Sequence, residues 1–430
     1  MTALAPPPAT APAPIGTTAR TTAPTTAEPP LAERFVGRRY LQLVLVLGAL
    51  GAIGPLTIDT YLPALPTLTA DLGATDVEAQ TTITGLLIGL GLGQLVIGPL
   101  SDAVGRRKPL LMGLAGHGLM SVLCALVPSI TMLAITRTLQ GVAGAAVAVV
   151  AMAIVRDLFS GYKAAQLLSR LVLVLGIAPI LAPSLGGALL QITSWRGIFV
   201  VLAFIALGLF LLAMFALPET LPPSRRIPAS LRGTLKAYRG LFADRAFLVL
   251  VAVAALMFSV LFAYVAGSSF ILQGMYDLTP QQFGLAFSST AVGLIIATQL
   301  NPLLLKRWTP IQILSGAVVI ALSGAVVLLA TSITGFGGLA GFMAPLWIMV
   351  GALGLSFPNA PAAALSRHGE TAGTAAAMLG ASQFVMGGLV APLVGALDNG
   401  TPVPMAAIMV SALAVAGTLL LVSRRALRAS

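Results

Sequence analysis

Residues 40–56 read YLQLVLVLGALGAIGPL, an apolar run without a single charge. Similar runs recur along the 430-residue chain, which is 57% hydrophobic and only 9% charged and has a mean hydropathy of +0.98. Soluble domains carry about 25% charged residues. Because the apolar residues are continuous rather than alternating, they indicate membrane-spanning helices and not the strands of a barrel. The sequence therefore predicts an all-α membrane protein.

Twelve such helices fit the chain, since each crossing needs about 20 residues. They form two groups of six with nearly equal lengths, separated by the polar residues 218–246. We therefore expect two pseudo-symmetric six-helix bundles, residues 36–217 and 247–425, joined by a cytoplasmic linker. The expected spans are 40–65, 79–101, 109–128, 131–156, 166–190, 197–217, 247–274, 282–304, 311–331, 336–361, 373–396 and 402–423, with Pro128 between the third and the fourth.

The cations predict the orientation, because short loops rich in Lys and Arg stay in the cytoplasm. With both termini inside, that side collects almost all of the 24 Lys and Arg residues, whereas Arg196 alone lies outside. The net charge of +11 is thus explained by topology. It gives no reason to expect a nucleic-acid partner, since contact with the anionic lipid bilayer is sufficient. The Ala-, Gly- and Val-rich composition indicates a bacterial source, and we expect the bacterial inner (plasma) membrane.

Residues 1–35 are rich in Pro, Ala and Thr, a composition that cannot form a packed core. We expect them to be a disordered cytoplasmic tail, because they also lack the charged start and apolar centre of a secretory signal. The single cysteine, Cys124, lies in an apolar span, so neither a disulfide nor a thiolate metal cluster is available. The sequence thus predicts no metal site and no cofactor.

Residues 98–111, GPLSDAVGRRKPLL, place four charges between the second and third spans. A cytoplasmic anchor explains the three cations. It does not explain the aspartate, nor the two glycines that permit close helix approach and a tight reversal. A set of polar contacts that forms in one conformation of the transporter and breaks in another explains these residues as well. The residues of this predicted gating motif are Gly98, Asp102, Gly105, Arg106 and Arg107.

The same loop resembles the G-x-L-x-D-x-x-G-R-R-K signature of the Major Facilitator Superfamily. That resemblance implies that Asp102 contacts neighbouring helix ends in the outward-facing state and releases them as the two halves rock, with Arg106 in support. Ala103 stands where an arginine is common in the family. The corresponding stretch of the second half, NPLLLKRW at 301–308, keeps only cations.

Further motifs resemble one group within that superfamily. RTLQGVAGAA at 137–146 is similar to a motif associated with proton coupling, and GIAPILAPSLGG at 176–187 is similar to the antiporter motif of drug exporters. With IDTYLPALP at 58–66, and with YDLTPQQFGLAFSS, AGTAAAMLGASQF and GALDNGTPVPMAA in the second half, the chain resembles the bicyclomycin and chloramphenicol resistance (Bcr/CflA) group of twelve-span drug:proton antiporters over residues 36–425. The antiporter-motif residues are Gly176, Pro179, Pro183, Gly186 and Gly187.

Two charges are predicted at depth in the membrane, Asp59 in the first span and Arg137 in the fourth. An unpaired charge there costs about 2.5–3.5 kcal/mol. The two spans run in opposite directions and place Asp59 and Arg137 at matching depths, so we expect the two side chains to share one cavity. A carboxyl group that is desolvated but close to a guanidinium is a candidate proton carrier. The alternative is a structural ion pair that holds the two spans together.

The second half has no charge at depth, so its inner surface is expected to bind a substrate by shape. Aromatic rings with a few amides suit an amphipathic organic molecule, although packing against neighbouring helices is the alternative for each ring. The expected substrate cavity comprises Phe258, Phe262, Tyr264, Asn359, Gln383 and Phe384, with Tyr61 and Gln140 opposite.

These features favour a monomeric transporter that uses the proton gradient as its energy source to export hydrophobic or amphipathic drug-like molecules, including antibiotics. A transporter of an endogenous metabolite, by export or symport, remains the alternative on the same fold. A membrane enzyme is disfavoured, because His117 and His368 lie far apart in the predicted topology and no carboxylate pair, nucleotide motif or metal motif occurs.

Overall fold

The computed structural model describes residues 37–159, 161–226, 231–366, 368 and 372–423. The expected disordered tail, residues 1–35, lies outside this range, as do residues 227–230 of the expected linker and residues 424–430. The regular elements of the described chain are all helical. They are α1 (Arg38–Asp59), η2 (Leu62–Ala64), α2 (Leu65–Asp71), α3 (Asp76–Val104), α4 (Arg107–Leu126), α5 (Ile130–Leu158), α6 (Gly161–Leu189), α7 (Trp195–Ala216), η3 (Pro223–Arg225), α8 (Leu231–Ala243), α9 (Arg245–Phe270), the π-helical η4 (Ile271–Met275), α10 (Pro280–Leu304), α11 (Pro310–Thr334), α12 (Gly338–Leu365), α13 (Ala372–Ala396) and α14 (Val403–Val422).

Eleven helical stretches within the described residues are long and apolar enough to cross a membrane. The first joins α1, η2 and α2 into one stretch, Tyr40–Asp71, and another joins α9 to η4. Helix α6 has 29 residues, and its apolar part within the described chain is the shorter Gly176–Leu189. The break expected at Pro128 lies between α4, which ends at Leu126, and α5, which begins at Ile130.

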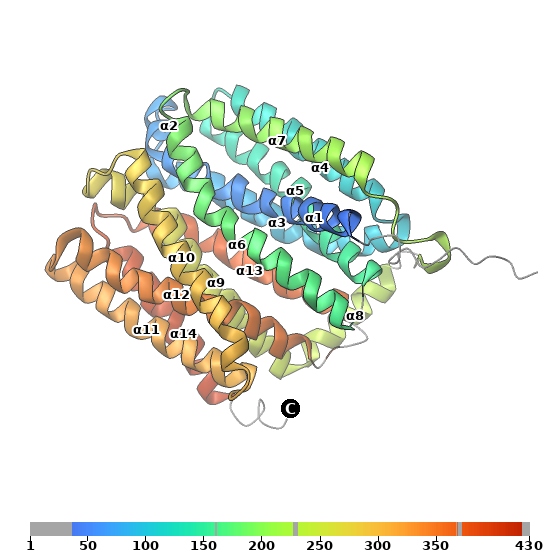
Figure 1. Ribbon diagram of the computed structural model, residues 1–430. Helices are drawn as coiled ribbons and strands as arrows, with labels where there is room; N and C mark the ends of the chain where they lie inside the picture. Colours follow the sequence, from blue (N-terminus) through green and yellow to red (C-terminus); the bar gives the residue numbers. More distant parts are fainter. Residues whose placement is uncertain (1–36, 160, 227–230, 367, 369–371, 424–430) are drawn as a thin grey trace, which may run out of the picture.

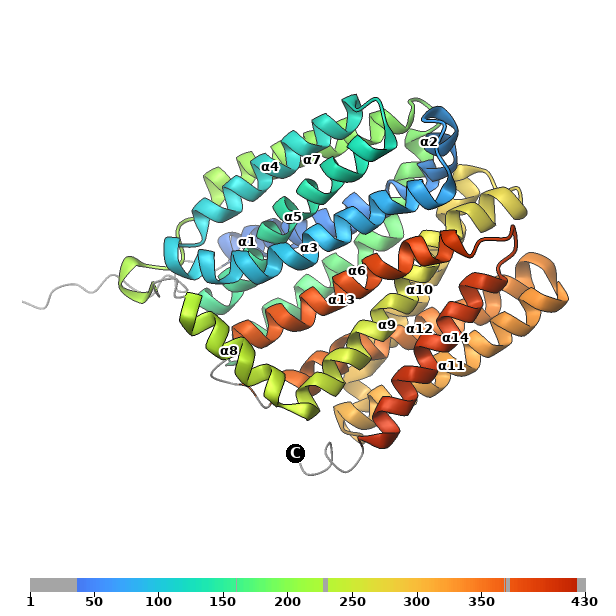
Figure 2. The ribbon, with the colours of Figure 1, turned by 180° about the vertical axis from the view of Figure 1, so that it is seen from behind.

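The long helices form two groups, which Figures 1 and 2 show side by side: α1 and α3–α7 in one, α9–α14 in the other. Helix α3 lies against α13 and α6 lies against α10, so these four helices make most of the contact between the groups. The short α2 lies at one end of the molecule and α8 at the opposite end. We call these the α2 end and the α8 end.

Several helices begin with the same local device. Thr75, Thr279 and Thr309 each accept a hydrogen bond from the backbone N–H three residues later, and the Glu or Gln at that later position bonds back to the threonine N–H. This capping box satisfies two donors that a helix N-terminus leaves unpaired. It fixes where α3, α10 and α11 begin after their polar turns.

Small residues bring α3 and α5 into backbone contact. A Cβ atom on Gly141 would lie 2.1 Å from the carbonyl oxygen of Leu86, and one on Gly89 would lie 2.1 Å from the carbonyl oxygen of Thr138. Close approach of this kind is how helices associate in lipid, where burial of apolar surface gives no driving force. These glycines therefore set the spacing within the first group.

The residues expected to form a linker contain a helix. Helix α8 places Leu241 in the core, 1% exposed, while Leu235 and Phe242 remain exposed. Asp244 then caps α9 by accepting from the N–H groups of Ala246 and Phe247. The connection between the groups is thus partly an ordered helix, and α9 begins two residues earlier than the sequence predicted.

We predict that Gly141→Ala destabilises the protein by about 1–3 kcal/mol, because the added Cβ must push α5 away from α3. Gly208→Ala is the matched control: it lies on an exposed face of α7, where a Cβ meets nothing within 4 Å. Thermal unfolding in detergent measures both variants. Equal melting temperatures for the two would contradict the spacing role of Gly141.

Candidate functional site

Arg137 on α5 is fully buried inside the first group of helices. Its Nη1 donates to the carbonyl oxygen of Thr57 at 3.2 Å and to Oε1 of Gln140 at 2.9 Å. The guanidinium carbon lies 4.7 Å from the ring centre of Tyr61 and 5.5 Å from that of Phe199. Two aromatic faces and two acceptors therefore surround this charge, in place of a carboxylate.

The partner carbonyl belongs to the last turn of α1, where carbonyl groups lack an N–H partner within the helix. A cation at a helix C-terminus also interacts favourably with the helix dipole. The surrounding groups extend the same network, since Nε2 of Gln140 donates to Ser121 at 2.7 Å and Thr57 Oγ1 bonds to Nε2 of His117 at 2.9 Å. Sequence reasoning missed Thr57, Ser121 and His117 as members of this cluster.

Asp59 does not pair with Arg137 in this structure, contrary to the shared cavity expected from their matching depths. Asp59 is 7% exposed, and its side chain has no hydrogen bond or ion pair among the described residues. It interacts electrostatically with Tyr264 of the second group. The reason is helical geometry, because side chains two residues apart in a helix point to nearly opposite sides. Arg137 contacts Thr57 and Tyr61, and Asp59 lies two residues from each of them, so its side chain points away from Arg137. The matching depths of Asp59 and Arg137 in the membrane therefore did not identify the partner of either side chain.

The two groups are joined by hydrogen bonds toward the α2 end. Ser269 Oγ donates to the carbonyl oxygen of Leu62 at 2.7 Å, and Thr84 Oγ1 donates to that of Gly388 at 2.8 Å. Toward the α8 end, a Cβ built on Gly98 of α3 or on Gly373 of α13 meets nothing within 4 Å. The groups are therefore closed against each other at the α2 end and separate toward the α8 end.

The predicted antiporter motif lies in that closed contact, on α6. A Cβ on Gly186 would lie 2.1 Å from the carbonyl oxygen of Thr60, and one on Gly187 would lie 2.6 Å from that of Pro280. Ser288 of α10 donates to the carbonyl oxygen of Ile180 at 2.5 Å. Pro183 lacks an N–H, so the carbonyl group of Pro179 loses its helical partner.

The remaining motif glycine, Gly176, faces Ile295 at 3.3 Å from its Cβ position. The motif thus packs α6 against both α1 and α10. Its role in antiport stays a prediction.

Four of the expected cavity residues are enclosed by packing. Tyr61 bonds to Thr82 at 2.9 Å, and Gln140 belongs to the Arg137 cluster. Tyr264 stacks on Phe287 with ring centres 4.8 Å apart, and Asn359 donates to Asn301 at 2.6 Å. Each of the four is at most 1% exposed. They support the two bundles from within.

The other members form an aromatic cluster in the second group. The Phe258 ring lies 4.9 Å from that of Phe262, 5.1 Å from that of Phe384 and 5.9 Å from that of Phe357. Phe258, Phe384 and the neighbouring Gln383 are half-buried, whereas Phe262 is 4% exposed. Phe357 is an addition to the predicted set. Whether this cluster binds a substrate stays a prediction.

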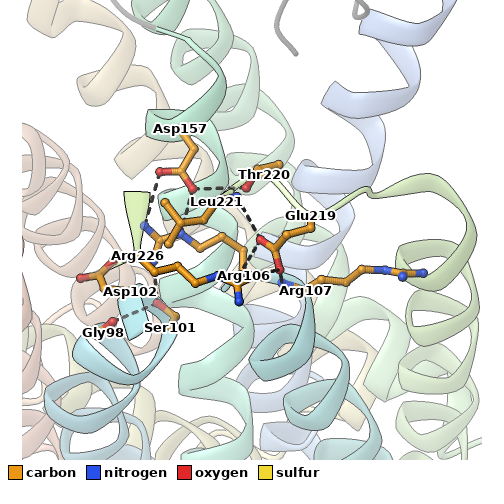
Figure 3. Close-up of polar contacts among 10 residues, drawn as sticks. All are labelled: Gly98, Ser101, Asp102, Arg106, Arg107, Asp157, Glu219, Thr220, Leu221 and Arg226. Atoms are coloured by element: carbon orange, nitrogen blue, oxygen red, sulfur yellow. Dashed lines mark hydrogen bonds and ion pairs between the residues drawn. The ribbon is translucent and has the colours of Figure 1, made fainter. Parts of the chain in front are cut away.

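Arg106 is the centre of the predicted gating motif, as Figure 3 shows. Its Nε donates to Asp157 at 2.8 Å, and its Nη1 donates to Ser101 at 2.8 Å and to Asp102 at 2.5 Å. The Arg106 side chain is 8% exposed and that of Asp157 is 16% exposed, but that of Asp102 is 47% exposed. Asp157 at the end of α5 is therefore the more enclosed of the two carboxylate partners.

The protonation of this arginine is secured by its partners. Burial lowers the pKa of the Arg106 guanidinium, but the hydrogen bonds to Asp157 and Asp102 raise it by more, so the pKa lies above the ordinary value for arginine. Arg106 is thus a permanent cation at the α8 end. The described partners of Asp102 are limited to this loop, and the contact with neighbouring helix ends that the resemblance implies for the outward-facing state is absent from the described residues.

Glu219, in the stretch after α7, caps α4 at the same place (Figure 3). Its Oε1 accepts from the backbone N–H of Arg106 at 2.8 Å, and its Oε2 accepts from that of Arg107 at 3.3 Å. An acceptor at a helix N-terminus satisfies unpaired donors and complements the dipole. Gly105 has φ of 97°, and a Cβ there would lie 2.4 Å from Oε2 of Glu219, so only glycine fits the turn.

We predict that Asp157→Asn destabilises the protein more than Asp102→Asn does. Asp157 supports a buried guanidinium, a contact worth about 1.5–3 kcal/mol, whereas the half-exposed Asp102 is worth about 0.2–1 kcal/mol. Thermal unfolding in detergent compares the two variants with the wild type. A larger loss for Asp102→Asn would mean that the enclosed partner is not the main one.

Comparison with known proteins places this arrangement in a family. Residues 45–392 match the family model described as Major Facilitator Superfamily. The chain is 38% identical over 379 residues to the uncharacterized MFS-type transporter YdgK of Bacillus subtilis, covering 87% of this chain and 93% of that protein. It is 30% identical over 371 residues to a bicyclomycin resistance protein homolog of Haemophilus influenzae, covering 84% and 91%.

The solved structure of a D-xylose–proton symporter has the same architecture, with a TM-score of 0.69, 16% sequence identity, and coverage of 88% of this chain and 97% of that chain. At that identity the likeness shows the fold alone. The match confirms the predicted all-α membrane fold. The family model and the relatives agree with the expectation of a transporter and not an enzyme. The chain therefore belongs to the Major Facilitator Superfamily.

Proposed function

We propose that this transporter is a proton-driven exporter of hydrophobic or amphipathic organic molecules, including antibiotics, in the bacterial inner membrane. The observation that carries the proposal is Asp59, a carboxyl group buried near the contact between the two halves and without a hydrogen-bonding partner among the described residues. Such a group can bind a proton in one facing state and release it in the other. The similarity to a bicyclomycin resistance protein homolog supports a drug-like substrate.

The distribution of charge supports an orientation with the α8 end in the cytoplasm. The loops and helix ends at that side carry the Arg106–Lys108 cluster, Arg225, Arg226, Lys306 and Arg307, whereas Arg196, at the start of α7, is the cation described at the α2 end. Short basic loops remain on the cytoplasmic side. The structure then corresponds to a state closed toward the outside, in which a substrate enters from the cytoplasm or the inner leaflet.

The proton gradient supplies enough free energy for this task without any cofactor. One proton that crosses 100 mV releases about 2.3 kcal/mol, which sustains about a fiftyfold concentration ratio of a neutral compound. A single carrier whose proton occupancy differs between the two facing states is sufficient. Arg137 does not neutralise Asp59 here, because its guanidinium is held by Thr57, Gln140 and two rings. Asp59 is therefore free to be that carrier, and Arg137 positions the end of α1 that presents it.

We predict that Asp59→Asn abolishes proton-driven accumulation while downhill exchange of drug persists, because the amide keeps the shape and removes the titration. Proteoliposomes with an imposed pH difference and a panel of amphenicols, bicyclomycin-like compounds and cationic dyes measure this. Asp277→Asn is the matched control, since Asp277 is exposed in the α9–α10 connection and its positive φ of 51° suits asparagine. If Asp59→Asn still concentrates drug against its gradient, the carrier lies elsewhere.

The aromatic cluster gives a separate prediction about substrate binding. Phe258→Ala and Phe384→Ala should each weaken binding of aromatic drugs about fivefold to tenfold, because each removes a ring face from the half-buried surface. Phe204→Ala is the control, since that ring is 69% exposed on α7, away from the cluster. Drug affinity measured by fluorescence in detergent distinguishes them. Equal affinities in all three variants would place the substrate elsewhere.

A further inference from the structure

One face of helix α8 is both apolar and positively charged. The helix reads LRGTLKAYRGLFA at 231–243, with three cations and no acidic residue. Leu235 and Phe242 are 59% and 61% exposed, and a spacing of seven residues places them on the same side of the helix. The exposed Arg239 lies between them on that side, and the exposed Lys236 lies beside it. We call these four side chains the α8 surface.

The opposite side of α8 is fixed to the second half. Leu241 is buried and shares a core with Phe247 and Leu250 of α9. The helix ends at Ala243, and the next stretch that is long and apolar enough to cross the membrane begins at Arg245. The end of α8 therefore lies where the chain enters the membrane, and the α8 surface is turned away from the protein.

The two cations of the α8 surface lack a carboxylate partner. Neither Lys236 nor Arg239 forms an ion pair with a described residue. The described carboxylates at this end bond to other groups: Asp102 and Asp157 to Arg106, Glu219 to the N–H groups of Arg106 and Arg107, and Asp244 to those of Ala246 and Phe247. The described chain therefore supplies no anion for this surface.

The composition of the α8 surface differs from that of a spanning helix. Helix α7 also exposes large apolar side chains, such as Phe204 and Phe215, but its single cation, Arg196, lies at its start. A helix face that contacts water alone carries charged and polar residues. A helix that lies at a membrane surface combines Phe or Leu with Lys and Arg. The α8 surface has this last composition.

We propose that the α8 surface binds the adjacent membrane leaflet and recognises its anionic lipid headgroups. Leu235 and Phe242 insert between the lipids, and Lys236 and Arg239 extend toward the phosphate groups. Each basic residue close to an anionic leaflet strengthens such binding about fivefold. Since the other side of α8 lies against α9 and α13, the surface fastens the start of the second half to the leaflet. The contact does not depend on which substrate the protein exports.

A fluorescent label at Gly240 tests the contact. Gly240 is exposed one turn after Lys236, and a Cβ there meets nothing within 4 Å, so Gly240→Cys leaves the α8 surface intact. The native Cys124 is fully buried and does not react with the label, bimane. The labelled full-length protein is placed, one copy per nanodisc, in discs of phosphatidylglycerol or of phosphatidylcholine. Both kinds of disc contain the same share of lipids with a nitroxide, which quenches nearby bimane, at the top of one acyl chain.

We expect quenching to be at least about twofold stronger in phosphatidylglycerol, because the two discs differ in headgroup charge alone. Lys236→Gln combined with Arg239→Gln should reduce it to the level in phosphatidylcholine. The matched control removes two exposed cations from the α10–α11 connection at the same end: Lys306→Gln combined with Arg307→Gln should leave the quenching unchanged. Phe242→Ser should weaken quenching in both discs, since it removes an inserted side chain. Size-exclusion chromatography confirms that each variant is folded.

Three results would overturn the proposal. Equal quenching in the two kinds of disc would show that the headgroup charge is not recognised. Absence of quenching in both would show that the surface faces water, where a soluble protein could reach it. An equal loss in the control pair and in the α8 pair would show that only the net charge of the protein matters. Because both leaflets of a disc contain the same lipid, the outcome is independent of the proposed orientation and of drug export.

Discussion

The N-terminal half is organised around the burial of the Arg137 guanidinium. A charge in the hydrocarbon region must be solvated by the protein, and here the end of α1, an amide and two aromatic faces perform that task. This requirement fixes the rotation of α1, because Thr57 and Tyr61 must both face α5. Asp59, two residues from each of them, then faces away from Arg137. The direction of the Asp59 side chain thus follows from the groups that solvate Arg137.

Contact between the halves rests on carbonyl groups and small residues more than on interlocking side chains. Gly187 and Gly284 bring backbone against backbone, and single hydroxyl groups such as those of Ser269 and Thr84 donate to carbonyl oxygens across the boundary. Hydrogen bonds of this kind between membrane helices are individually weak, about 0.6 kcal/mol on average. A boundary made of many weak contacts can separate stepwise, as alternation between facing states requires.

The sequence predicted the parts of this protein that depend on composition and local pattern. The apolar runs gave the long helices, and the turn at Pro128 was located because proline and serine interrupt a continuous pattern. Asp59 and Arg137 do not form an ion pair in this structure although their depths match, because depth can be read from a sequence, whereas the face of a helix near its irregular end cannot. Asp157 and Glu219 were missed because they lie about 50 and 110 residues from the loop they hold. The sequence placed Glu219 only within the polar stretch 218–246 and gave it no partner.

Glu219 also has a mechanical position. Its carboxylate holds the first residues of α4, and along the chain it directly precedes the segment that runs through α8 into the second half. Two residues that follow it along the chain are held at the same place, since Thr220 donates to Asp157 and Arg226 lies 4.0 Å from Glu219. The chain that leaves α7 is thus fastened to the gating loop at several points before it continues toward the second half.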